Sequence, residues 1–433
     1  MRPQKRLVVC CDGTWKRADD QNVSNIEKIA RAIDTTPLPR EPVQVVYYTA
    51  GVGTGATRTE RFLGGGLGLG LDISLIGAYR FLALNYTPGD EVFVFGFSRG
   101  AYTARSLVGM IATIGLLKPE GVVQDNLHNA INVYRNRPRK DDPHPDPDAE
   151  KDVEHFRKGC YRNDQMKIRF LGVFDTVGAL GVPGLSRRKY QFHNVALPDE
   201  IEVVTARQAL AIDEQRRTFT PAVWSRGEQP HTDVKQVWFE GVHTDIGGGY
   251  PESNLSDLTL LWMLREAKTC GLVVHDTRIN SRLDPKPVDP PHNSLIGWYP
   301  TLNRLSKIGQ RLGLSTRIGL RFSGNHRLLE SSVKKDSDKD LSIYLAQTAH
   351  DRWKDTSAEL RERSTIGWWT ASLKRQSIKL TDRIEELPPF PASQQSETEL
   401  RSTTESPLTA ANLPAPDGSG SVNSSISTDP DPT

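Results

Sequence analysis

Short runs of apolar residues recur along the first 240 residues, and most of them do not alternate with polar residues. Uninterrupted apolar runs of this kind are typical of strands that are buried on both faces, as in a parallel sheet. The pattern predicts strands at residues 7–11, 44–48, 91–95, 168–174 and 234–239.

Between these runs, apolar residues recur at the spacing of amphipathic helices. The spacing predicts helices over residues 24–33, 73–84, 99–114, 201–212 and 256–270. Ser24 is a suitable N-cap for the first helix, with Glu27 three residues later, and Gly271 suits the end of the last. Strands that alternate with helices indicate a doubly wound, mostly parallel α/β sheet.

Other segments depart from this alternation. We expect a core over residues 5–275, with helical insertions at about 118–160 and 179–230 and a helical region at about 300–380. Residues 384–433 are rich in Pro, Ser, Thr and acidic residues, a composition typical of disorder. The sequence therefore predicts one α/β domain over residues 1–383 and a disordered acidic tail over 384–433.

Charge is unevenly distributed along the chain. The chain holds 55 Lys and Arg against 53 Asp and Glu, yet residues 384–433 contain eight acidic residues and one basic residue, so the body is basic. A basic body accepts anionic partners such as phospholipid head groups, although a solvated surface is the simpler interpretation. Peripheral membrane contact is one expectation, because basic residues flank apolar ones at helical spacing (Leu302, Leu305, Ile308 and Leu312). A surface helix packed on the core is the commoner meaning of that pattern, and we expect no nucleic-acid partner.

The remaining composition points to a cytoplasmic protein without a cofactor or a metal. The cysteines form no C-x-x-C pair, so no zinc site is expected, and they suit a reducing compartment (Cys10, Cys11, Cys160 and Cys270). The N-terminal apolar run is too short for a signal peptide, and the stretch 62–86 is interrupted by charges and glycines, so it should not span a membrane. The glycine-rich segments 51–55 and 64–70 match neither nucleotide-binding pattern.

The clearest chemical signal spans residues 91–105. An apolar strand runs directly into Gly96-Phe97-Ser98-Arg99-Gly100 and then into helix-forming residues. A serine nucleophile needs this context, because the tight strand-to-helix turn exposes its hydroxyl above the sheet at a helix N-terminus. G-x-S-x-G is common by chance, but the strand before it and the helix after it make the match specific. We expect Ser98 to be a nucleophile, with an idle serine in a glycine-rich turn as the alternative.

A serine hydroxyl becomes nucleophilic when a base takes its proton and a carboxylate orients that base. In this kind of fold the acid and then the histidine follow the serine along the chain, each after a strand end. Asp175 directly follows the strand at 168–174, and His243 follows the strand at 234–239. We therefore expect a triad of Ser98, Asp175 and His243. Asp245 is the alternative partner of His243, or a support for the glycine-rich loop around it.

The oxyanion of such a reaction needs fixed N–H donors. We expect one from the amide of Arg99 and a second from the loop after the first strand, at Gly13 and Thr14. Gly13 allows close backbone approach. A simple turn in which Asp12 caps backbone amides is a nearly equal alternative for the side chains.

Taken together, these segments resemble the α/β-hydrolase family of type VI secretion phospholipase effectors and their relatives, formerly a domain of unknown function. The resemblance rests on motifs between residues 5 and 275, among them Cys11-Asp12-Gly13-Thr14-Trp15, Gly96-Phe97-Ser98-Arg99-Gly100, Phe174-Asp175-Thr176 and Gly241-Val242-His243-Thr244-Asp245. It implies an α/β-hydrolase-like fold, a triad of Ser98, Asp175 and His243, and cleavage of phospholipid esters.

The leading functional hypothesis is thus a serine hydrolase that cleaves a carboxylic ester of a lipid through an acyl-enzyme. An inactive protein that uses the same fold for interaction is one alternative. A phosphatase with an aspartate nucleophile at Asp12 is another, but its chemistry requires an aspartate two residues earlier, where Cys10 stands.

Overall fold

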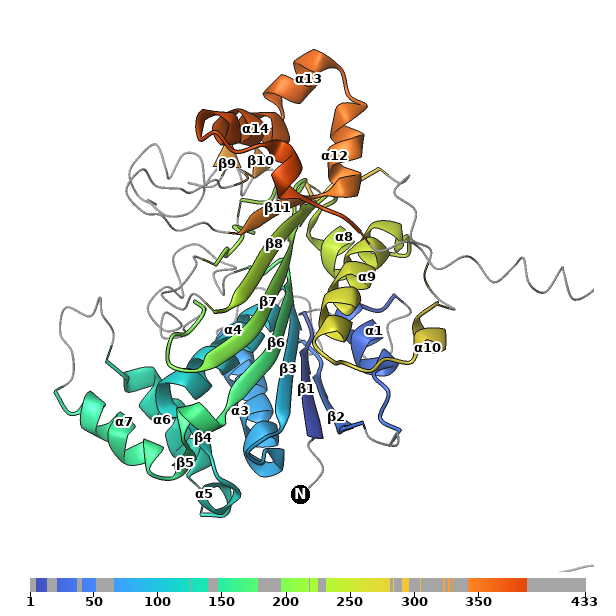
Figure 1. Ribbon diagram of the computed structural model, residues 1–433. Helices are drawn as coiled ribbons and strands as arrows, with labels where there is room; N and C mark the ends of the chain where they lie inside the picture. Colours follow the sequence, from blue (N-terminus) through green and yellow to red (C-terminus); the bar gives the residue numbers. More distant parts are fainter. Residues whose placement is uncertain are drawn as a thin grey trace, which may run out of the picture. The chain divides into compact units, whose positions relative to one another are not determined.

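A parallel sheet forms the centre of the computed structural model (Figure 1). Within the part of the chain that the structure describes, the sheet has eight strands in the order β12-β11-β8-β7-β6-β3-β1-β2. Their bounds are β1 Lys5–Cys11, β2 Val43–Thr49, β3 Glu91–Phe97, β6 Lys167–Phe174, β7 Glu202–Ala211, β8 Asp233–Phe239, β11 Ile343–Ala346 and β12 Ile384–Glu385. The strand order reverses next to β1 and β3, as in a doubly wound sheet.

The described residues are 5–13, 22–36, 41–51, 66–124, 126–138, 147–177, 196–217, 219–224, 231–280, 283, 290–295, 304, 322–323, 326–327, 329 and 342–387. The expected tail beyond residue 387, the apolar pattern at residues 302–312 and the candidate Thr14 lie outside them.

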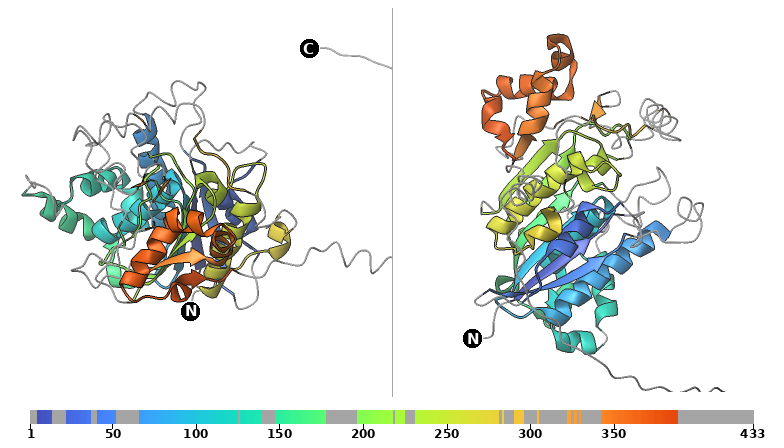
Figure 2. Two further views of the ribbon diagram at one scale, coloured as in Figure 1. Left: turned by 90° about the horizontal axis from the view of Figure 1, so that it is seen from above. Right: turned by 90° about the vertical axis from the view of Figure 1, so that its right-hand side faces the viewer.

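Helices cover both faces of the sheet (Figures 1 and 2). One core cluster joins one sheet face to α3 (Gly66–Asn85) and α4 (Arg99–Ile114). The other joins the opposite face to α1 (Asn25–Ala32), α9 (Asn254–Thr269) and α10 (Asp276–Asn280). Buried strand residues contribute to both clusters, and this explains why the strands read as continuous apolar runs. The fold class expected from the sequence is confirmed.

Two groups of helices extend this core. The segment between α4 and β6 contains α5 (Pro119–Val123), α6 (Leu127–Asn136) and α7 (Ala149–Arg157), as expected for the first insertion, together with the short strands β4 (Leu116–Leu117) and β5 (Cys160–Tyr161). Near the C-terminus, α12 (Gln347–Lys354), α13 (Ala358–Arg363) and α14 (Thr365–Arg375) lie beside the β11–β8 end of the sheet (Figure 1). A further short hairpin joins β9 (Phe322–Ser323) and β10 (His326–Arg327).

Local signals placed most elements correctly. All five predicted strands are present, and Ser24 caps α1 by accepting a hydrogen bond from the Glu27 amide at 3.1 Å. The last predicted helix starts two residues early, at Asn254. The four cysteines are buried and form no disulfide. No described helix is long and apolar enough to cross a membrane.

The helix predicted over residues 201–212 is wrong, because this segment is β7, in the middle of the sheet. Its second half, Ala206–Ala211, consists of good helix formers. The parallel neighbours β6 and β8 bury both of its faces, and this environment overrides the local preference. The second insertion, expected over 179–230, is therefore interrupted by a core strand.

The expected domain boundary at residue 383 also lies too early. Ile384 and Glu385 form β12, which pairs with β11. Glu385 is buried and accepts hydrogen bonds from Trp262 and Arg265. A buried carboxylate requires such partners, so the first residues of the acidic stretch belong to the fold. The chain divides into compact units at Pro389 and Phe390. Disorder of the remaining tail stays a prediction.

Candidate active site

Ser98 occupies the turn between β3 and α4, as the sequence predicted. Its backbone has φ 57° and ψ −119°, a conformation that is strained for a residue with a side chain. The Ser98 amide donates to the carbonyl of Phe174 at 3.0 Å, which ties the turn to the end of β6. The strand, the strained serine and the helix therefore follow one another directly at this turn.

The two glycines around Ser98 are required by packing. A Cβ atom on Gly96 would lie 2.6 Å from the Ala101 Cα, inside the turn. A Cβ atom on Gly100 would lie 2.1 Å from the carbonyl oxygen of Cys11, at the end of β1. Both contacts involve backbone atoms, which cannot rotate away. The close approach of α4 to β1 therefore depends on these glycines.

Asp175 and His243 meet at the same edge of the sheet. Asp175 directly follows β6, and His243 is the first residue of α8 (His243–Gly247), which follows β8. The His243 Nδ1 lies 2.5 Å from the Asp175 Oδ2. Asp175 itself has a positive φ of 37°, and its amide donates to the Ala209 carbonyl at 2.7 Å. Both side chains are buried.

Phe97 connects His243 to the serine turn. The Phe97 ring lies beside the imidazole, with 4.7 Å between the ring centroids. Gly247, at the end of α8, packs so closely on the same phenyl ring that an added Cβ would overlap it, at 2.0 Å. The residue before Ser98 is therefore in contact with the helix that carries His243, so the three predicted triad residues share one region of the sheet edge.

Arg327 is a buried partner of Asp175 that the sequence did not reveal. Its Nη1 lies 2.7 Å from Asp175 Oδ1, its Nη2 lies 3.1 Å from Oδ2, and both side chains are fully buried. Although burial by itself raises the pKa of Asp175, the Arg327 charge and the hydrogen bond with His243 outweigh it and hold this pKa well below its usual range. Asp175 is therefore ionised at neutral pH. A separation of 152 residues leaves no local signal for this pair.

His243 is held neutral by its surroundings. Burial lowers the pKa of His243, and the opposing effect of Asp175 does not restore it. The ring also contacts Phe219, with 4.9 Å between centroids. The Asp175 carboxylate favours the tautomer with a proton on Nδ1, which leaves Nε2 as an acceptor. The backbone amide of His243 donates to the buried Glu214 at 3.2 Å, which fixes the start of α8.

Asp245, the alternative partner of His243, binds a different histidine. Its Oδ1 lies 2.6 Å from the His292 Nδ1, and its Oδ2 accepts from the backbone amides of His292 at 3.1 Å and Val242 at 2.9 Å. The His292 ring also stacks on Tyr250. Asp245 thus anchors the segment around His292 to the loop that carries His243.

Asp12 braces the loop after β1. Its Oδ1 accepts from the Gly13 amide at 2.6 Å, and its Oδ2 accepts from the hydroxyls of Ser24 at 2.6 Å and Tyr48 at 2.8 Å. In this arrangement the Gly13 amide donates its hydrogen bond to the Asp12 side chain. This is the capping turn that the sequence offered as the alternative. Arg99 begins α4, with its amide at the helix N-terminus beside Ser98.

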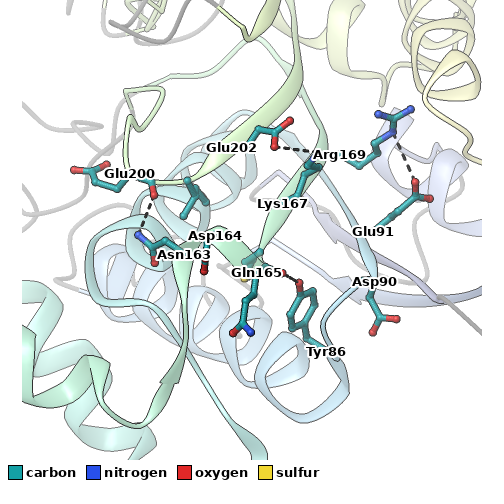
Figure 3. A pocket seen from close by; sticks show the side chains of 13 residues that line it. Tyr86, Asp90, Glu91, Asn163, Asp164, Gln165, Lys167, Arg169, Glu200 and Glu202 are labelled. Atoms are coloured by element: carbon teal, nitrogen blue, oxygen red, sulfur yellow. Dashed lines mark hydrogen bonds and ion pairs between the residues drawn. The ribbon is translucent and has the colours of Figure 1, made fainter. Parts of the chain in front are cut away.

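A separate cleft of about 670 Å³ lies at the opposite edge of the sheet (Figure 3). It is lined by residues at the amino ends of β3, β6 and β7, where Lys167 pairs with Glu202 at 2.9 Å and Arg169 lies 3.8 Å from Glu91. Ser98 follows the carboxyl end of β3, so this cleft does not belong to the site. Among the described residues, no group of three or more His, Cys, Asp or Glu side chains is arranged to hold a metal ion.

Residues 5–266 match the family described as the catalytic domain of Tle1-like phospholipase effectors of the type VI secretion system. The chain belongs to this family. The matched region contains Ser98, Asp175 and His243, whereas Arg327 and His292 come from the chain beyond it. In this Tle1-like chain, the C-terminal part therefore completes the surroundings of the site.

Relatives of the Tle1-like chain include an uncharacterized protein of Saccharomyces cerevisiae, YEL023C, which is 28% identical over 228 residues, 50% of this chain and 32% of that protein. A crystal structure of an uncharacterized protein from Pseudomonas aeruginosa aligns with a TM-score of 0.38 and 18% identity, covering 64% of this chain and 47% of the other. A structure of the Tle1 effector bound to the VgrG spike of the type VI secretion system aligns with a TM-score of 0.33 and 20% identity, covering 58% and 53%. The chain thus spans about a third of the yeast protein and about half of each solved structure.

Proposed function

We propose that this chain hydrolyses a carboxylic ester of a phospholipid through an acyl-enzyme formed on Ser98. The observation that carries the proposal is the buried Asp175–His243 contact of 2.5 Å, together with the contact of this imidazole with Phe97, which precedes Ser98 in a strained strand-to-helix turn. Membership of a phospholipase effector family supports the lipid substrate.

In the proposed reaction, the Nε2 of His243 accepts the proton of the Ser98 hydroxyl as Oγ attacks the ester carbonyl. The imidazolium is stabilised by Asp175, and it then returns the proton to the departing alcohol. A water molecule, deprotonated by His243, then attacks the acyl-enzyme; the bond to Ser98 Oγ breaks, His243 returns the proton to Oγ, and the fatty acid is released. Burial favours neutral His243 at neutral pH, which is the state that a general base needs.

The oxyanion of the tetrahedral intermediate needs amide donors. We assign the first to Arg99, at the N-terminus of α4. The second comes from the loop after β1, at Gly13 or Thr14. Because the Gly13 amide donates to Asp12 in this arrangement, Gly13 would serve only after Asp12 turns away. Thr14 lies outside the described residues and remains the other candidate. Peripheral contact with the membrane follows from a phospholipid substrate.

The test is covalent labelling with a fluorophosphonate, followed by liposome hydrolysis. The wild-type chain should be labelled on Ser98 and release fatty acid, and Ser98→Ala should do neither. Asp175→Asn should reduce turnover by several orders of magnitude, because its amide favours the wrong tautomer of the histidine. Asp245→Asn is the matched control and should keep much more activity, since Asp245 binds His292. Labelling that is unchanged in Ser98→Ala would refute the proposal.

A further inference from the structure

Arg327, in the short strand β10 (Figure 1), joins several segments around the proposed base. Its side chain is fully buried, and its two terminal nitrogens donate four hydrogen bonds. Two go to the Asp175 carboxylate, at 2.7 and 3.1 Å, one goes to the Ala211 carbonyl at 3.0 Å, and one goes to the Phe219 carbonyl. A side chain without access to solvent does not reach a substrate, so any effect of Arg327 on a reaction passes through these partners.

Each of the three segments carries a group that contacts His243. Asp175 lies 2.5 Å from its Nδ1 atom. The Phe219 ring packs against the imidazole, with 4.9 Å between centroids and 78° between the ring planes. Ala211 ends β7, and three residues later Glu214 accepts a hydrogen bond from the His243 amide at 3.2 Å. One guanidinium therefore connects the groups that hold the ring nitrogen, the ring and the backbone of the proposed base.

The orientation of the Asp175 carboxylate depends on this fork. Its Oδ1 accepts from Arg327 Nη1 and from the Ala211 amide at 3.2 Å, and its Oδ2 lies against both Arg327 Nη2 and the His243 ring. Because the fork holds both oxygens, the carboxylate cannot rotate without losing a hydrogen bond to a charged group. The acid of a triad holds the histidine in the correct tautomer and orientation. A fixed carboxylate therefore fixes the direction in which Nε2 of His243 points.

The charge of Arg327 also acts on the proton of the base. A positive charge beside the Asp175–His243 pair disfavours the uptake of a further proton. The two groups share a short contact and titrate as a unit, so loss of this charge should raise the pH at which the pair takes up a proton. The charged groups around the pair come from four elements and are Asp175, Glu214, Arg216, Arg327 and, on the helix of His243 itself, Asp245.

We propose that Arg327 is a positioning residue for the proposed base and acts on it in two ways. Its fork holds the groups that orient the imidazole of His243, and its charge keeps that imidazole neutral at mildly acidic pH. As a statement about turnover, the proposal rests on the proposed ester hydrolysis. Arg327 lies beyond residues 5–266, so the region that matches the family model does not contain every residue that the proposed site uses.

The kinetic test measures kcat and KM of the full chain against pH with a short soluble ester, at a temperature at which every variant is folded. Arg327→Met should lower kcat by about a hundredfold with little change in KM, as expected for a base misplaced by about 1 Å. It should also move the acid limb of kcat/KM to higher pH by about one unit. Arg327→Lys keeps the charge but lacks the fork, so kcat should fall while the acid limb stays in place.

Arg207→Met is the matched control for lost stability. Arg207 is also a buried arginine, and it pairs with Glu266 at 2.6 Å and donates to the Asp233 carbonyl at 2.8 Å. Asp233 begins β8, at the edge of the sheet opposite His243. The control should lower the melting temperature and leave kcat and the acid limb unchanged. Equal changes of kcat and of the acid limb in Arg207→Met and Arg327→Met would overturn the proposal, because both would then report lost stability alone.

A titration separates this proposal from the proposed function. The histidine ring signals of the Ser98→Ala chain are followed by NMR against pH, and the His243 signal is identified by its loss in His243→Gln. Adding Arg327→Met should raise the midpoint of this signal, and adding Arg207→Met should not.

The outcomes distinguish the two proposals. A raised midpoint without any Ser98-dependent hydrolysis would refute the proposed function and leave the assignment of Arg327 to the state of His243 intact. Ser98-dependent hydrolysis with wild-type kcat and acid limb in Arg327→Met, or with an unmoved midpoint, would overturn the assignment of Arg327 alone. If Arg327→Met does not fold, Arg327→Lys decides the question, and a wild-type kcat of that variant would be the overturning result.

Discussion

The buried ion pair between Arg327 and Asp175 makes a quantitative prediction about stability. Both side chains are fully buried, and the guanidinium contacts both carboxylate oxygens, at 2.7 and 3.1 Å. Arg327→Met keeps the length and the apolar stem of the side chain but leaves Asp175 without its cationic partner. Removing one partner of a buried pair costs about 3–5 kcal/mol, because the other charge stays buried. We therefore expect Arg327→Met to lower the free energy of unfolding by about that amount.

The pH dependence of this loss provides a second check. The folded state depresses the pKa of Asp175, so the ion pair stabilises the fold above the ordinary pKa of an aspartate, about 3.9. This contribution is lost as the pH falls toward the folded pKa. The difference between wild type and Arg327→Met should therefore be largest near neutral pH and shrink below about pH 4.

Urea unfolding followed by tryptophan fluorescence at pH 7 and at lower pH measures both effects. Arg162→Met is the control, because Arg162 is largely exposed and its ion pair is with the exposed Asp164, so it should change stability little. If Arg327→Met unfolds at the same urea concentration and with the same slope as wild type, the buried pair does not contribute as described.

Further expectations concern the proposed base His243, the turn at Ser98 and the strand β12. Because burial lowers the pKa of His243, the acid limb of the kcat/KM profile should lie below pH 6.5, and a limb above pH 7 would contradict a buried neutral base. Gly100→Ala should abolish folding or fluorophosphonate labelling of Ser98, because the added Cβ would overlap backbone atoms. Gly159→Ala is the control and should be tolerated, because its Cβ would lie 3.6 Å from its nearest neighbour. Equal melting temperatures and equal labelling of the two variants would contradict the close packing at Gly100. A chain that ends at residue 389 should have the melting temperature of the full chain. A chain that ends at residue 383 should melt at a lower temperature, because it loses the buried contacts of Glu385. Equal melting temperatures of the two truncated chains would show that β12 does not stabilise the fold.

Features that depend on neighbours in sequence could be predicted from the sequence. The turn at Ser98 is one of them, because strand, glycine-flanked serine and helix are consecutive and the two glycines mark where the backbones approach. The N-cap of α1 at Ser24 is another. The placement of Asp175 and His243 followed from a general rule, since the carboxyl ends of parallel strands meet at one edge of the sheet.

Only the tertiary structure decided the features that depend on distant partners. Ala206–Ala211 are good helix formers, and they belong to a strand because β6 and β8 lie on both sides. The sequence favoured Asp175 as the partner of His243 and left Asp245 as an alternative, and the folded chain brings the first to that ring and the second to His292. Arg327 reaches Asp175 across 152 residues. In each case the deciding energy comes from burial and pairing between segments far apart in the chain, and no local pattern carries that information.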